Sequence, residues 1–272
     1  MEKKKWTPRR SLLVLGLAAV VLALLLLVVF RFWPKEAAPE IYTGNPQTPV
    51  QHPVSIDPNL QNMGQAQTPE QAKQSEISGF TDRDLGETKL RNGLEIIRGG
   101  SYTGAFVEDG SNAPCSDVLA LVVTNTSDRF LEWAELALSV GEETAYFRIS
   151  SLPAGQSLLV MERSAMTYDP AAAYGQTVLL NSTEGEKDFS LHTERFSITA
   201  ADHVVNLQNL SPEEISGNIA IFYKNVVDGL YLGGITYTKT LTSGVAGGGI
   251  AQFICENYTV AGSELVFIVY EQ

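Results

Sequence analysis

The stretch VLALVVTNTS, residues 118–127, decides the fold class of this chain. Its first seven residues form a nearly continuous apolar run with the length of a β-strand, and the Asn-Thr-Ser group that follows is a turn signal. Helical periodicity is almost absent from about residue 82 onward. The stretch therefore predicts that this part of the chain is built from β-strands.

Further strand signals, separated by turns, lie on both sides of this stretch. Gly141-Glu142-Glu143 and Asp228-Gly229 separate neighbouring strands as hairpin loops do, and Gly233-Gly234 suggests a β-bulge. We expect one helical turn over Asp169–Gly175, which has an N-cap residue, a proline and a terminal glycine. The strand-length segments are Leu94–Arg98, Val118–Thr124, Leu136–Val140, Ala145–Ile149, Leu158–Met161, Val205–Leu207, Ile219–Tyr223, Leu230–Leu241, Ile250–Cys255 and Leu265–Tyr270.

The same scheme occurs twice along the chain. Leu121, Val123, Asn125 and Ser127 match Val205, Leu207, Asn209 and Ser211 at an offset of 84 residues. Leu152–Gly155 matches Leu241–Gly244 at an offset of 89. Because short strands with one apolar face must bury it against a second sheet, about 90 residues of them fit an immunoglobulin-like sandwich. We expect an all-β ectodomain of two tandem sandwiches, residues 82–185 and 186–272, with one larger jelly-roll-like domain as the alternative.

An uncharged apolar run of 20 residues, Ser11–Phe30, precedes all of these signals. At about 1.5 Å per residue it would span roughly 30 Å, the hydrocarbon core of a bilayer, and it would have to be helical there. Five basic residues precede the run, which places that end in the cytoplasm by the positive-inside rule. We expect a cytoplasmic tail over 1–10 and a lipid-embedded helix over 11–33. A cleaved signal peptide is the alternative, but its apolar region would be only about 7–15 residues long.

Residues 34–81 have the composition of a flexible tether. Seven of the twelve prolines of the chain fall here, and large apolar side chains are rare. Such a stretch cannot bury enough surface to offset its ordering entropy. One short helix is expected inside it, at Thr68-Pro69-Glu70-Gln71, from its N-cap residue, its proline and its capping-box glutamine.

Charge and cysteine content exclude several classes of protein. Residues 36–272 carry 12 basic and 30 acidic side chains, a net charge of −18, which repels nucleic acid. Two cysteines, Cys115 and Cys255, allow one disulfide bridge or two buried thiols, and the sequence leaves both open. The four Asn-x-Ser/Thr sites are glycan acceptors in a eukaryotic secretory protein and turn residues in a bacterial one: Asn125, Asn181, Asn209 and Asn257.

No catalytic, cofactor or metal site can be assigned. His192 and His203 lie near Ser190, Glu194 and Asp202, but a serine triad needs a nucleophile elbow and an oxyanion hole, and the sequence has neither signal. Gly247-Gly248-Gly249 lacks the Gly-Lys-Ser/Thr ending of a phosphate loop. Glu108, Asp109 and Asp117 do not have the spacing of a calcium loop. Four aromatic residues could face a ligand or pack in a core: Trp133, Tyr223, Tyr231 and Tyr237.

Several short motifs carry a family resemblance, which covers roughly residues 1–35 and 90–272. They are Ser101-Tyr102-Thr103-Gly104, residues 106–111, Leu152–Gly155, Tyr223-Lys224 and Gly233–Tyr237. The chain resembles a group of uncharacterised single-pass surface proteins of Clostridia and related Firmicutes. The resemblance implies a bacterial origin and a surface location, and it carries no activity with it.

These patterns together favour a non-enzymatic protein of the cell membrane. The N-terminus would lie in the cytoplasm, and the two sandwiches outside the cell would bind an unknown protein or glycan partner, with no cofactor and no nucleic acid. The alternative is a structural subunit of a cell-envelope complex, engaged through residues 11–33 or through a sheet edge.

Overall fold

A computed structural model describes residues 69–185 and 189–271 of the chain. The expected cytoplasmic tail, the lipid-embedded helix over 11–33 and most of the tether lie outside these residues. Within the described part of the chain, no helix combines the length and the apolar composition that crossing a bilayer requires.

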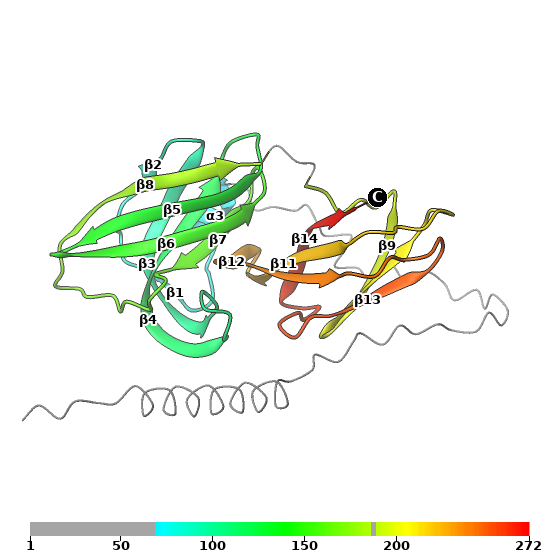
Figure 1. Cartoon of the computed structure of the whole chain (residues 1–272). Helices are drawn as coiled ribbons and strands as arrows, with labels where there is room; N and C mark the ends of the chain where they lie inside the picture. The colour runs from blue at the N-terminus through cyan, green and yellow to red at the C-terminus, as the bar shows by residue number, and fades with distance from the viewer. Residues whose placement is uncertain (1–68, 186–188, 272) are drawn as a thin grey trace, which may run out of the picture. The chain divides into compact units, whose positions relative to one another are not determined.

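The described residues are mostly β-strand, which confirms the prediction of an all-β chain (Figure 1). A single short helix, α3 (Pro69–Gln74), precedes the strands in this part of the chain. The first half of the described chain contains β1 (Phe80–Asp82), β2 (Thr88–Lys89), β3 (Leu94–Phe106), β4 (Ala113–Asn125), β5 (Leu131–Val140), β6 (Glu143–Leu152), β7 (Ser157–Met161) and β8 (Tyr174–Glu184). The second half contains β9 (Phe196–Ala201), β10 (Val204–Asn209), β11 (Ile219–Val227), β12 (Leu230–Leu241), β13 (Ile250–Ile254) and β14 (Ser263–Tyr270).

The strands form three sheets. One sheet of eight strands has the order β1-β3-β4-β7-β12-β11-β14, with β2 also paired to β3. The other two sheets have three strands each, in the orders β6-β5-β8 and β13-β10-β9. Strands β7 and β12 pair in parallel, whereas all other named pairs of the described strands are antiparallel. The parallel pair joins the first half to the second within one continuous sheet.

Each half has its own apolar core between two layers of strands. In the first half, β3, β4 and β7 face β5, β6 and β8, and Leu121, Phe147 and Leu158 are fully buried between them. In the second half, β9, β10 and β13 face β11, β12 and β14 around Leu207 and Ile221. Both halves nevertheless belong to the same compact unit of the chain.

A third apolar cluster covers the outer face of β3, β4 and β7. Val118, Ala120 and Val122 point into this cluster, whereas the alternate residues of β4 point into the first core. Burial on both faces explains why the run is apolar throughout instead of alternating. Ala72 and Ile77 are buried in the same cluster. The short helix predicted here is confirmed, and two residues of the expected tether over 34–81, Ala72 and Ile77, pack against the strands.

A buried asparagine organises the end of β4 in the first half. The side-chain Nδ2 of Asn125 donates hydrogen bonds to the carbonyls of Leu152 (3.0 Å) and Arg129 (2.8 Å). Its Oδ1 accepts the backbone N–H of Ser127 at 3.1 Å, and its own carbonyl accepts the N–H of Gly155 at 2.8 Å. The amide thus ties the turn after β4 to the turn after β6.

Asn209 makes the corresponding contacts in the second half. Its Nδ2 donates to the carbonyls of Val245 (3.3 Å) and Glu213 (2.8 Å). Its Oδ1 accepts the N–H of Ser211 at 3.0 Å, and its carbonyl accepts the N–H of Gly248 at 3.0 Å. The repeat noted in the sequence therefore corresponds to a repeated hydrogen-bond framework.

The second part of the sequence match is wrong. Leu152–Gly155 corresponds to Val245–Gly248, at an offset of 93 residues, and not to Leu241–Gly244 at 89. The strand registers agree with the corrected offset, because Val123 pairs with Leu158 as Leu207 pairs with Ala251. Leu241–Gly244 has the same Leu-x-x-Gly spacing and lies four residues before the equivalent turn, which is why the sequence match selected it. Only the contacts to the asparagine identify the equivalent turn.

Candidate functional site

The two histidines considered for catalysis are far apart. His192 precedes β9 and His203 follows it, so the six residues of β9 separate them by roughly 20 Å at ~3.3 Å per residue. The hydroxyl of Ser190 accepts the backbone N–H of His192 (3.3 Å), and the His192 ring lies 3.4 Å from Glu194. These residues do not form a serine triad.

The glycine triplet and both buried sequons serve the fold. Gly247–Gly249 forms the turn that Asn209 holds, and a Cβ at Gly247 would lie 2.0 Å from the carbonyl oxygen of Pro212. Asn125 and Asn209 are essentially inaccessible, which agrees with a role in turns and not with glycan attachment. Cys115 and Cys255 are free thiols, so the disulfide alternative is wrong.

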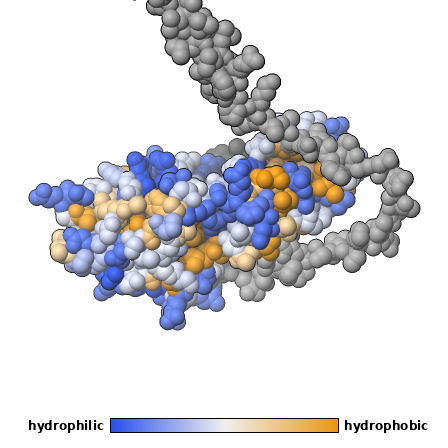
Figure 2. Space-filling model, turned by 90° about the horizontal axis from the view of Figure 1, so that it is seen from below, coloured by the Kyte–Doolittle hydropathy of each residue, from blue (hydrophilic) through white to orange (hydrophobic). Residues whose placement is uncertain are grey.

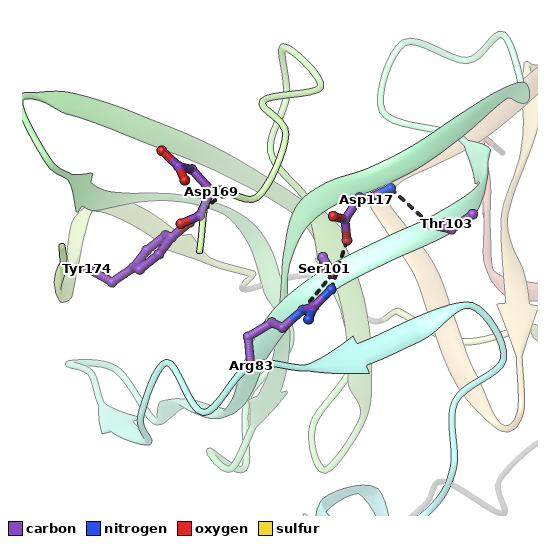
Figure 3. A network of polar contacts seen from close by, with 6 residues as sticks. All are labelled: Arg83, Ser101, Thr103, Asp117, Asp169 and Tyr174. Atoms are coloured by element: carbon purple, nitrogen blue, oxygen red, sulfur yellow. Dashed lines mark hydrogen bonds and ion pairs between the residues drawn. The ribbon is translucent and has the colours of Figure 1, made fainter. Parts of the chain in front are cut away.

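The acidic residues considered for calcium have protein partners instead. The Asp109 carboxylate accepts the N–H of Ser111 at 2.9 Å. Asp117 lies 3.2 Å from the guanidinium of Arg83, which also donates to Ser101 at 3.3 Å (Figure 3). A hydrogen bond from Ser101 and the neighbouring Arg83 lower the pKa of Asp117. Within the described residues, no three His, Cys, Asp or Glu side chains gather as metal ligands would.

The same arginine begins an aromatic stack. The Arg83 guanidinium lies 4.8 Å from the ring centre of Tyr168, and Tyr168 stacks on Tyr174 at 5.4 Å. The Tyr174 hydroxyl donates to the carbonyl of Asp169 and accepts its N–H (Figure 3). The segment expected as a helical turn is thus a hydrogen-bonded turn, with an Asp169–Ala171 contact. The two tyrosine rings hold this connection in place. They stack on each other, and Arg83 covers the Tyr168 ring.

The four aromatic candidates divide into two groups. Tyr223 and Tyr231 are buried in the second and first cores and cannot face a ligand. Trp133 and Tyr237 are half-buried. The Tyr237 hydroxyl donates to the side-chain oxygen of Asn112 at 3.2 Å, which places it at the junction of the two halves.

A polar cluster around the buried residues Lys224 and Gly234 holds that junction together. The Glu108 carboxylate accepts the N–H groups of Gly234 (3.0 Å) and Met161 (2.9 Å). The Lys224 ammonium, fully buried, donates to the carbonyls of Gly234 (3.3 Å) and Ile235 (2.7 Å). Ser150 also donates to the Gly234 carbonyl, at 2.9 Å. Both polar groups of Gly234 are therefore bound by side chains from three different elements.

The predicted bulge at Gly233-Gly234 creates these contacts. The β11–β12 register shifts between Tyr223 and Asn225, so residues 233–236 stand opposite Lys224 alone. A Cβ at Gly234 would lie 1.6 Å from the carbonyl oxygen of Arg148, which shows how closely β12 approaches β6. Burial raises the pKa of Glu108 to about 7 and lowers that of Lys224 to about 7.

Beside this cluster lies an open groove of about 290 Å³. Three asparagines line it and bond to one another: Asn112 donates to Asn257 at 3.0 Å and accepts from Asn225 at 3.3 Å. The rest of the lining comes from both halves, namely Ala105, Val226, Leu232, Glu256, Thr259 and Gly262. This groove is the best candidate for a binding site among the described residues.

The groove offers mixed hydrogen-bonding groups and little charge. Asn112 and Asn225 each donate one side-chain hydrogen bond to another amide of the groove, so donors and acceptors alternate along its lining. Glu256 supplies an exposed carboxylate as an acceptor. Such a lining suits a polar, uncharged ligand. Asn112 and Asn225 were not predicted from the sequence, because isolated asparagines in a loop and a strand carry no pattern. Asn257 was recognisable only as a sequon.

No protein-family model matches this chain, and neither curated proteins nor solved structures include a significant match to it.

Proposed function

We propose that this chain is a single-pass membrane protein that presents two immunoglobulin-like sandwiches outside the cell to bind a neutral glycan. The junction groove is the single observation that carries the binding proposal, because residues from both halves line it and three of them carry amides that both donate and accept hydrogen bonds. The charge of −18 over residues 36–272 disfavours an anionic ligand.

The two-sandwich part of the proposal is supported by the repeated framework around Asn125 and Asn209 and by the two separate cores. Two layers of antiparallel strands around each core are the arrangement expected of such sandwiches. The location is supported by the apolar run Ser11–Phe30 and its basic flank.

Binding can be tested with the full chain in mild detergent and immobilised cell-wall glycans, neutral and acidic. We expect neutral glycans to be retained, and Asn257→Ala to weaken retention about tenfold, the cost of about one hydrogen bond. Asn181→Ala is the matched control, because Asn181 is an exposed asparagine on β8, away from the groove lining. Equal binding by both variants, or no glycan binding at all, would refute the groove as the site.

Location can be tested separately with Glu142→Cys, a change in the exposed β5–β6 hairpin loop. A membrane-impermeant maleimide should label this thiol on intact cells. Labelling that requires cell lysis would contradict the proposed orientation, whatever the binding experiment gives.

A further inference from the structure

One edge of strand β13 is unpaired within the part of the chain that the structure describes. Among the described strands it pairs with β10 only. The carbonyl of Gly249 accepts the backbone N–H of Asn209, and the N–H of Cys255 donates to the carbonyl of His203. These two bonds show which residues of β13 have their backbone groups directed toward β10. The odd-numbered residues of β13 therefore bond to β10, and the backbone groups of the three even-numbered residues point to the open edge: Ile250, Gln252 and Ile254.

The side chains of these three residues lie on the outer face of the sheet and are exposed. Ile250 and Ile254 are 67% and 56% accessible, the most of any large apolar side chains in the described residues. Figure 2 shows that the apolar surface on one face of the molecule forms separate patches between polar residues. Natural edge strands are usually protected by a charge, a proline or a bulge. Residues 250–254 contain no charge and no proline, and their pairing with β10 has no register shift.

The equivalent edge in the first half is already an interface. By the offset of 93 residues, Leu158 and Leu159 of β7 correspond to Ala251 and Gln252 of β13, and β12 pairs with them. Leu159 and Met161 are completely buried beneath residues such as Leu230 and Ile77. The same edge of the same structural repeat is thus covered in one half, whereas no described residue pairs with it in the other.

We propose that the β13 edges of two copies of this chain pair antiparallel about a two-fold axis at Gln252. The outward-facing residues read Ile-Gln-Ile in both directions, so the strand is self-complementary. Gln252 would face Gln252 of the second copy, and Ile250 would face Ile254 of the second copy. This register pairs only residues whose backbone groups are free, and it joins two strongly acidic chains where neither has a charge.

The expected dimer is weak. Two five-residue strands form about six backbone hydrogen bonds, and the contact is smaller than the roughly 1,200 Å² of a stable interface. We therefore expect association at micromolar or higher concentration.

Cross-linking tests the register. Gln252→Cys, in a Cys115→Ser background of the full chain in mild detergent, should give a covalent dimer with a short bismaleimide. Cys255 is buried, with a pKa raised to about 11, and should not react. Gln176→Cys is the matched control, an exposed glutamine on the edge strand β8. Absence of a dimer, or equal dimer from both variants, would overturn the proposal.

A charge on the edge tests it independently. Gln252→Glu places two carboxylates against each other on the axis, which destabilises the pairing. We expect the wild-type chain to associate at about 100 µM. At this concentration, light scattering should give the variant a mass closer to that of the monomer. Val178→Glu on β8 should leave the mass unchanged, and circular dichroism confirms that each variant is folded. A dimer that persists in Gln252→Glu, or a wild-type chain that is monomeric at that concentration, would refute the pairing.

Discussion

At the scale of single residues, Asn125 and Asn209 are the side chains on which most local structure depends. Each is buried, and each binds backbone groups from two turns that are distant in sequence. An amide does this well because it donates and accepts at once. Truncating it leaves several buried carbonyls and N–H groups without partners.

We expect Asn125→Ala and Asn209→Ala each to lower the free energy of unfolding by about 2–4 kcal/mol. Asn181→Ala removes the same group from an exposed position and should change it by less than about 0.5 kcal/mol. Urea unfolding followed by circular dichroism measures both. A loss as small as that of the control would mean that the turns do not need the amide.

Glu108 and Lys224 give stability a pH dependence with a definite sign. The pKa of Glu108 is raised from 4.5 to about 7 by burial, so between these values the folded chain holds more protons than the unfolded chain, and stability falls as pH rises. The pKa of Lys224 is lowered from 10.5 to about 7 by burial. Between pH 7 and 10.5 the unfolded chain holds more protons, and stability rises with pH.

The variants Glu108→Gln and Lys224→Met should separate these two effects. Glu108→Gln should remove the fall in stability between about pH 4.5 and 7, and Lys224→Met the rise above pH 7. The urea midpoint of each variant, subtracted from that of the wild type at each pH, measures the change. A difference that does not vary with pH would show that neither group titrates in its window.

At the scale of elements, the sequence predicted strands better than their edges and partners. The run at 118–124 was recognisable as a strand because burial on both faces makes β4 apolar throughout. The hairpin at Asp228-Gly229 was recognisable because both residues adopt the positive φ that a tight hairpin turn requires. Strand β8 was missed, since its exposed Val178 and Leu180 break the alternation. The groove was not predictable at all, because its asparagines meet only after β11 and the β3–β4 loop come together.

The bulge in β12 is the element on which the junction depends. Gly234 has no space for a side chain, because a Cβ would lie 1.6 Å from the carbonyl oxygen of Arg148. We expect Gly234→Ala to cost more than about 3 kcal/mol of stability. Gly141→Ala is the control: its φ is +59° but nothing lies within 4 Å, so backbone strain alone should cost about 1 kcal/mol. Thermal unfolding compares the two, and equal losses would argue against the close approach of β12 and β6.

At the scale of the whole molecule, the two halves repeat one plan but depend on each other. The parallel pair β7–β12 completes a sheet that neither half forms alone. Leu230 and Leu232 of the second half are buried against Leu159 and Met161 of the first. Separating the two halves would expose this apolar surface. It would also leave Glu108 without the N–H of Gly234 and without the nearby charge of Lys224.

We therefore expect the described part of the chain to unfold in a single cooperative transition, because breaking the junction costs nearly as much as opening a core. Differential scanning calorimetry of the full chain should show one peak, with a calorimetric enthalpy equal to the van't Hoff enthalpy. Residues 186–272 produced alone should bind the dye ANS through the exposed Leu230 and Leu232, which the full chain keeps buried. Two resolved peaks, or an isolated half that is stable and does not bind the dye, would mean that the halves are independent domains and that the shared sheet contributes little to their stability.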